Sequence, residues 1–186
     1  MQNKTDKTVH PGPWRLRLGA GILVLAWLSL NALRCPSPAE AWLITASVAI
    51  AGHLLIGVYV FIYKLRAVTA WHQRADTFAF LFLFAAAAST GNTPLWCASF
   101  AGLFAIAILK YQTCAEETHP PALDRYIRSK IRLESPAVFC FMSAALVTAA
   151  LPETHPLQTG IPVLLFSGAA LFAVYLILIR RIYRNL

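Results

Sequence analysis

Histidine is the residue type best suited to chemistry in this chain, because imidazole binds metals and transfers protons near neutral pH. Of the five histidines, only His53 lies near the middle of an apolar segment, within Ala51 to Leu55. There it could ligate a cofactor, bind a polar substrate or relay a proton; the alternative is a hydrogen bond to a neighbouring helix. A haem held by two histidines would need a second imidazole at the same depth, and the sequence has none.

A second polar group, His72 with Arg74 and Asp76, stands where another apolar segment begins. Such a cluster can bind a phosphate or a lipid head group, although charges also gather at helix ends that leave a bilayer. We therefore take His53, His72 and Arg74 as the candidate ligand-binding residues. The sequence shows no spacing typical of a metal site, and it indicates no particular cofactor.

The four cysteines form no C-x-x-C motif, and most of them are expected to be small apolar side chains. Cys35 and Cys97 lie on the same predicted side of the membrane. A disulfide between these two is therefore possible in an oxidising compartment.

Motifs of known enzymes are absent: there is no Walker loop, no H-E-x-x-H and no G-x-S-x-G. We assign no catalytic residue, and the sequence favours a protein that is not an enzyme. An enzyme acting on lipid or quinone at the cytoplasmic interface would have to use His72, His119, Asp124 or Arg125. No carboxylate is apparent inside an apolar segment, which argues against ion-coupled transport.

The amino-acid composition indicates whether the chain folds in water or in a lipid bilayer. Of the 186 residues, 58% are hydrophobic and 13% charged, and the mean hydropathy is +0.60. A soluble domain carries about 25% charged residues, so the bilayer is the better solvent for most of this chain. In lipid the backbone must satisfy its own hydrogen bonds, which favours an all-α fold. The net charge of +8 falls at the ends of apolar segments, which argues against a nucleic-acid partner.

The apolar segments predict a single membrane domain over residues 1–186, with a polar tail at 1–14 and six transmembrane helices. These helices are expected at about 16–33, 41–63, 75–90, 94–109, 136–151 and 161–179. All Lys and Arg residues except Arg34 then fall on one side, so the positive-inside rule places both termini in the cytoplasm. The prediction is three antiparallel helical hairpins, in a bacterial inner membrane.

The longest internal polar stretch, 110–135, is predicted to be a cytoplasmic loop. Leu123, Ile127 and Ile131 recur at helical spacing after Pro121, which predicts an amphipathic helix lying in the head-group layer. Anionic phospholipid would hold it there, or a protein partner or second copy would dock on it. The residues expected to make these contacts are Arg125, Tyr126, Arg128, Lys130 and Arg132.

Together these features predict a non-catalytic, multi-pass membrane subunit. It would bind a small or lipidic molecule within its bundle, or it would scaffold a membrane transport or assembly complex. The alternatives are the interfacial enzyme described above and a passive channel.

Overall fold

The structure is a computed structural model that describes residues 12–33, 38–60, 70–116, 121–152, 155–157, 160–161 and 164. Its regular elements are five α-helices, and no strand occurs among the described residues. They are α1 (Gly12–Leu33), α2 (Pro38–Val60), α3 (Ala70–Ala88), α4 (Thr93–Ala115) and α5 (Pro121–Ala150). The predicted all-α fold is therefore confirmed for this part of the chain.

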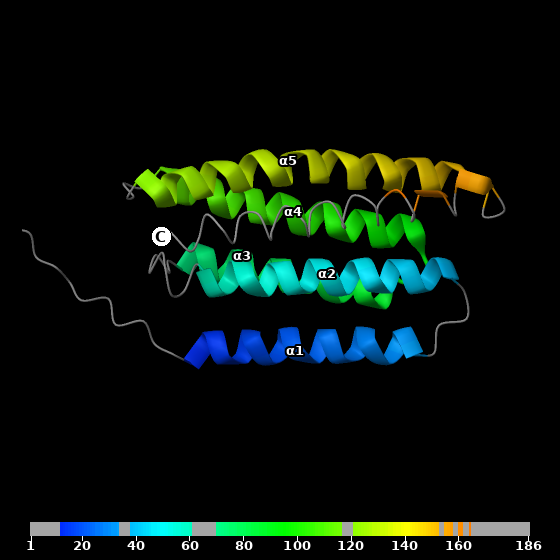
Figure 1. Cartoon of the computed structure of the whole chain (residues 1–186), viewed down its shortest axis with the longest axis horizontal. Helices are drawn as coiled ribbons and strands as arrows, with labels where there is room; N and C mark the ends of the chain where they lie inside the picture. The colour runs from blue at the N-terminus through cyan, green and yellow to red at the C-terminus, as the bar shows by residue number, and fades with distance from the viewer. Residues whose placement is uncertain are drawn as a thin grey trace, which may run out of the picture.

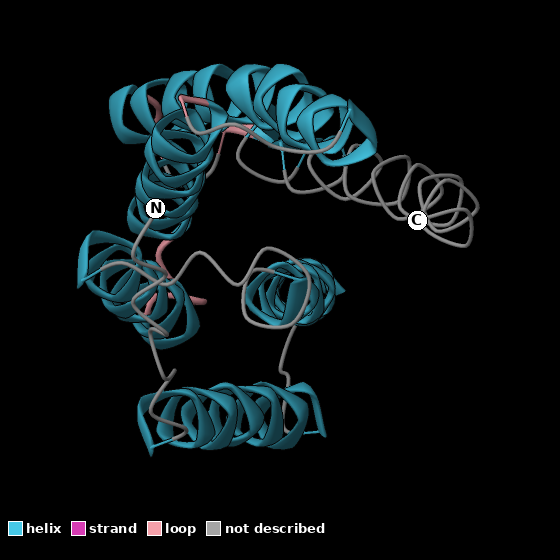
Figure 2. Ribbon diagram, turned by 90° about the vertical axis from the view of Figure 1, so that its left-hand side faces the viewer, coloured by secondary structure: helices cyan, strands magenta, loops and turns pink. Residues whose placement is uncertain are grey.

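The helices lie side by side with their long axes roughly aligned, and α1 and α5 are at opposite edges of the array (Figure 1). Helix α5 packs on α4, α4 packs on α3, and α1 packs on both α2 and α3. Seen along the bundle in Figure 2, α2 and α3 lie between α1 and α4, and α5 lies beyond α4. Residues from α2, α3, α4 and α5 can thus meet inside one bundle.

The turn between α3 and α4 follows from its sequence. The side chain of Asn92 accepts a hydrogen bond from the backbone N–H of Leu95, at 3.1 Å, and so caps α4. Pro94 occupies the first turn of the helix, where its missing N–H costs nothing. This short connection makes α3 and α4 an antiparallel hairpin, as the sequence predicted.

Among the described residues, two helices are long and apolar enough to cross a membrane. They are α4, with 23 residues, and the 28-residue part of α5 from Leu123 to Ala150, each with a mean hydropathy of 1.5 over its best window. At about 1.5 Å per residue they measure about 34 and about 42 Å, against a hydrocarbon core of about 30 Å. Only 44% and 29% of these windows are buried within the bundle, whereas the core helix of a soluble protein is mostly buried. The two helices are a weak indication of membrane association.

Helices α1 to α4 correspond to the first four predicted segments, but the prediction for 110–135 was wrong. Helix α4 continues to Ala115, and α5 runs unbroken from Pro121 through Pro136 to Ala150. Within the described residues 121–150, neither a loop nor a separate interfacial helix precedes Pro136. One proline removes a single backbone donor, and the packing of α5 along α4 offsets this loss. The sixth predicted helix, 161–179, and most of the tail, 1–14, lie outside the described residues.

An aromatic cluster fills the bundle near the α3–α4 turn. Trp96 packs edge-on against Phe100, with ring centroids 4.7 Å apart, and Phe104 stacks on Phe141 of α5 at 5.6 Å. The indole N–H of Trp96 donates to Ser47 on α2, at 2.9 Å. The end of the bundle at this turn is therefore packed by apolar rings, and the charged side chains described next lie toward the other end.

Candidate functional site

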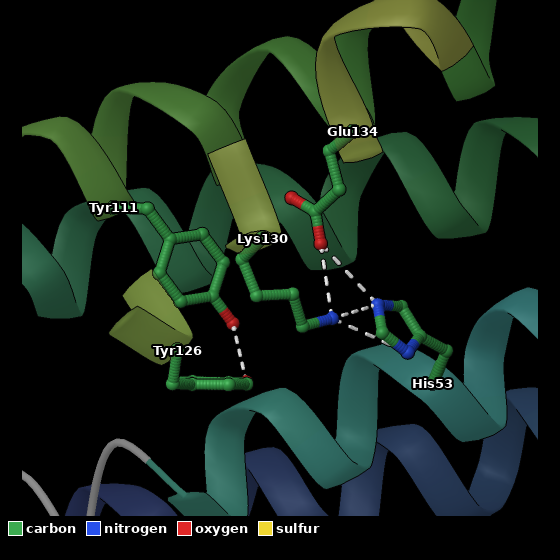
Figure 3. A network of polar contacts seen from close by, with 5 residues as sticks. All are labelled: His53, Tyr111, Tyr126, Lys130 and Glu134. Carbon is green, nitrogen blue, oxygen red and sulfur yellow. Dashed lines mark hydrogen bonds and ion pairs between the residues drawn. The ribbon is translucent and has the colours of Figure 1, made fainter. Parts of the chain in front are cut away.

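His53 on α2 meets two charged residues of α5 inside the bundle (Figure 3). Its Nε2 lies 3.3 Å from Oε1 of Glu134, and the same carboxylate oxygen accepts from Nζ of Lys130 at 3.1 Å. The Lys130 ammonium also contacts Nε2 of the imidazole and lies 3.5 Å from Nδ1. His53 is 7% exposed, and Lys130 and Glu134 are each 2% exposed, so all three are withdrawn from solvent. We call these three residues the buried triad.

The helical period explains how α5 supplies two members of the buried triad. Lys130 and Glu134 are four residues apart and therefore project from the same face of the helix. Tyr126, one turn earlier, shares this face, and its hydroxyl lies 3.3 Å from that of Tyr111 on α4. The Tyr111 ring faces the Lys130 ammonium at 5.9 Å, within range of a cation–π interaction.

The donors and acceptors of the buried triad permit more than one distribution of protons. A lysine ammonium only donates, a carboxylate only accepts, and a neutral imidazole does one of each. If Lys130 donates to Nε2 of His53, the ring proton must be on Nδ1; if Nε2 carries the proton, it donates to Glu134. The second carboxylate oxygen, Oε2 of Glu134, is buried and has no hydrogen-bond partner among the described residues. The triad is thus chemically equipped to hold and pass on a proton.

A second buried ion pair lies close to the triad. Lys110 of α4 donates to the carboxylate of Asp76 on α3 at 2.5 Å, and both side chains are buried. A cavity of about 30 Å³ is lined by this pair and by His53 and Glu134. One water needs about 10–15 Å³ on this measure, so the cavity has room for about two waters. It is far too small for a lipid or a quinone.

His72 lies one helical turn from Asp76 on α3, and its Nε2 is 3.3 Å from the Thr113 hydroxyl and 3.4 Å from the Cys114 thiol. Arg74, by contrast, is exposed on the surface of α3. The three predicted ligand-binding residues are therefore not brought together. His53 belongs to the buried triad, His72 to the contact between α3 and α4, and Arg74 to the surface.

The five residues predicted to face the head groups or a partner are also separated. Arg125, Arg128 and Arg132 are exposed, and Arg128 pairs with Asp124 at 2.9 Å. Tyr126 and Lys130 are buried, so the prediction of an exposed position was wrong for these two. They share the face of α5 that packs into the bundle.

The structure also bears on the remaining candidates. Asp124 and Arg125 lie on the outer part of α5 while His72 is buried between α3 and α4, and His119 is outside the described residues. Cys97 is buried, and it forms no disulfide with another described cysteine. Its predicted partner Cys35 is outside the described residues, and the disulfide stays a prediction.

The sequence analysis missed the buried carboxylates. The expectation that none lies inside the bundle was wrong, because Asp76 and Glu134 are both buried. The signal was the spacing of Lys130 and Glu134, four apart and in register with the apolar residue Ile127. It was overlooked because this helix was expected to lie in the head-group layer with its charged residues exposed.

Comparisons of this chain with models of protein families, with curated proteins and with solved structures find no match. Within the described residues, no three His, Cys, Asp or Glu side chains are grouped so that they could hold a metal ion. The chemistry of the site must therefore be argued from the side chains themselves.

Proposed function

We propose that this chain is a multi-pass membrane subunit that crosses the bilayer six times, with both termini in the cytoplasm. Support comes from the length and composition of α4 and α5. The arrangement of Lys and Arg along the sequence supports the same orientation. On this topology the turn between α3 and α4 lies on the side of the membrane opposite the cytoplasm, and the connection between α4 and α5 is cytoplasmic.

We further propose that the subunit is not catalytic and that its buried triad takes up and releases a proton during transport. The observation that carries this proposal is the contact of three ionisable side chains, each no more than 7% exposed, inside an apolar bundle. Burying an ion costs several kcal/mol, so charged groups inside membrane proteins usually mark the path of an ion or proton. The neighbouring cavity fits water and protons better than the lipidic molecule expected from the sequence.

Proton flux in liposomes tests the triad. The purified protein is reconstituted with a pH-sensitive dye inside the vesicles, and a membrane potential drives proton entry. Glu134→Gln should reduce the flux to the level of protein-free vesicles, because an amide cannot exchange a proton in this range. Asp124→Asn is the matched control, since it makes the same chemical change on the exposed side of the same helix, and it should keep the flux of the wild type.

Two results would contradict the proposal: no flux above protein-free vesicles for the folded wild type, or equal flux for wild type and Glu134→Gln. The topology is tested separately by thiol labelling with a reagent that does not cross membranes. In a variant whose four native cysteines are replaced by serine, cysteine introduced at the exposed position Gly91 should react in intact cells. Cysteine introduced at the exposed position Glu116 should react only after permeabilisation. The reverse pattern would invert the proposed orientation.

A further inference from the structure

One exposed face of α5 changes from basic to apolar along its length. Its side chains follow alternating spacings of three and four residues, so they form one stripe on the helix. The exposed members are Arg125, Arg128, Arg132, Phe139, Met142 and Leu146. The stripe thus carries three arginines at one end and three large apolar side chains at the other. The change falls between Arg132 and Phe139, over about 10 Å of helix.

Helices α3 and α4 change in the same way. On α3, exposed Trp71 and Arg74 are followed by exposed Phe78 and, one turn later, Leu81. Helix α4 runs in the opposite direction, and its exposed side chains change from apolar at Leu109 to polar at Gln112 and Glu116. Three consecutive helices therefore expose apolar side chains toward the α3–α4 turn and polar ones toward the other end.

The buried charges show that these three changes occur at one level of the bundle. The ion pair between Asp76 and Lys110 shows that these two residues lie at the same height along the bundle. On α3, Asp76 lies between Arg74 and Phe78. Glu134 lines the same cavity as Lys110, and it lies between Arg132 and Phe139 on α5. A single plane through Asp76, Lys110 and Glu134 therefore separates the polar from the apolar surface.

We propose that the arginine face of α5, formed by Arg125 and Arg132, binds the head groups of anionic phospholipid at this plane. Arg128 lies between them but is paired with Asp124, so it is not counted as part of this face. Charge complementarity favours a phosphate-bearing partner, because a guanidinium pairs with two phosphate oxygens at once. Continuity with the apolar stripe favours lipid over a soluble anion, since the acyl chains of the same molecule would cover Phe139 and Met142. The buried triad then lies at the depth of the head groups and not at the bilayer midplane.

The test is a titration of the purified, full-length protein in neutral detergent with dioctanoyl phosphatidylglycerol, with dioctanoyl phosphatidylcholine as the uncharged reference. Arg125→Gln/Arg132→Gln should weaken binding of the anionic lipid by about thirtyfold, or about fivefold for each arginine near the surface. Arg125→Lys/Arg132→Lys keeps both charges and should retain most of the affinity.

The exposed Asp124–Arg128 pair supplies a matched control on the same helix. Asp124→Asn/Arg128→Gln also alters two side chains, but it leaves the net charge unchanged and should leave the affinity unchanged. Circular dichroism and thermal melting establish that each variant is folded as the wild type is.

Three outcomes would overturn the inference. In one, the Arg125→Gln/Arg132→Gln protein binds the anionic lipid as tightly as the wild type does. In another, the charge-neutral double variant loses as much affinity as the charge-removing one. In the third, glycerol 3-phosphate binds as tightly as the lipid, which would make the arginine face a site for a free anion. None of these outcomes depends on proton transport, so the two proposals fail independently.

Discussion

Removing one member of the buried Lys130–Glu134 pair should destabilise the protein more than removing both. Each side chain is 2% exposed, so the charge left behind by a single substitution is withdrawn from bulk solvent. Glu134→Gln leaves the Lys130 ammonium without its carboxylate, and Lys130→Met leaves the carboxylate without its cation. Stranding one charge of a buried pair costs about 3–5 kcal/mol, so the two single changes should together cost about 6–10 kcal/mol.

The double variant Lys130→Met/Glu134→Gln contains neither charge. Its remaining cost is an imperfectly hydrogen-bonded amide, about 1–3 kcal/mol. The coupling energy of the cycle should therefore reach several kcal/mol, at the upper end of the range for directly contacting residues.

The assay is reversible unfolding by a denaturing detergent in mixed micelles, followed by circular dichroism and tryptophan fluorescence. The exposed Asp124–Arg128 pair is the matched control, because it has the same four-residue spacing on the same helix. Solvent screens that pair, so its coupling energy should be close to zero. The reasoning is refuted if the buried and exposed pairs give equal coupling, or if the buried double variant is as unstable as the sum of its single variants.

Two further predictions concern packing, and thermal melting checks both. Gly102→Ala should lower the melting temperature, because the added methyl group would lie 2.5 Å from the ring of Phe82; Gly52→Ala, with nothing within 4 Å of the new methyl group, should stabilise by about 0.5–1 kcal/mol. A more stable Gly102→Ala protein would contradict this contact. Ser47→Ala removes the acceptor of the buried Trp96 indole N–H and should cost about 1–3 kcal/mol. A neutral Ser47→Ala would mean that the indole finds another acceptor.

The sequence alone predicted those parts of the fold that depend on how apolar each segment is. Apolar length predicted the positions of α1 to α4, with ends that differ by up to six residues, because a helix satisfies its backbone in an apolar environment whatever its partners are. His53 was likewise identified as a candidate from its position in the middle of an apolar segment, and it belongs to the buried triad. These features depend on local composition alone.

The sequence alone did not predict those parts of the fold that depend on contacts between distant residues. Residues 121–135 contain enough charge to resemble a solvated segment, yet one face of this part of α5 is buried against α4. Lys130 is tolerated there because His53 and Glu134 surround its ammonium, and His53 is 77 residues away in sequence. No local pattern shows a partner at that distance, so composition assigned Lys130 to the surface.

The wide separation of His53 from Lys130 has a consequence for the biosynthesis of the chain. A ribosome adds about 5–20 residues per second, so the 77 residues between them take on the order of 4–15 s to make. The Asp76–Lys110 contact needs only α3 and α4 and can form within the earlier hairpin. The contacts of His53 with Lys130 and Glu134 must wait for α5, so a nascent chain arrested before residue 130 would lack both of these partners of the imidazole. Such a chain differs from the finished protein in its core. Proteases and chaperones that bind newly inserted helices could therefore distinguish the two.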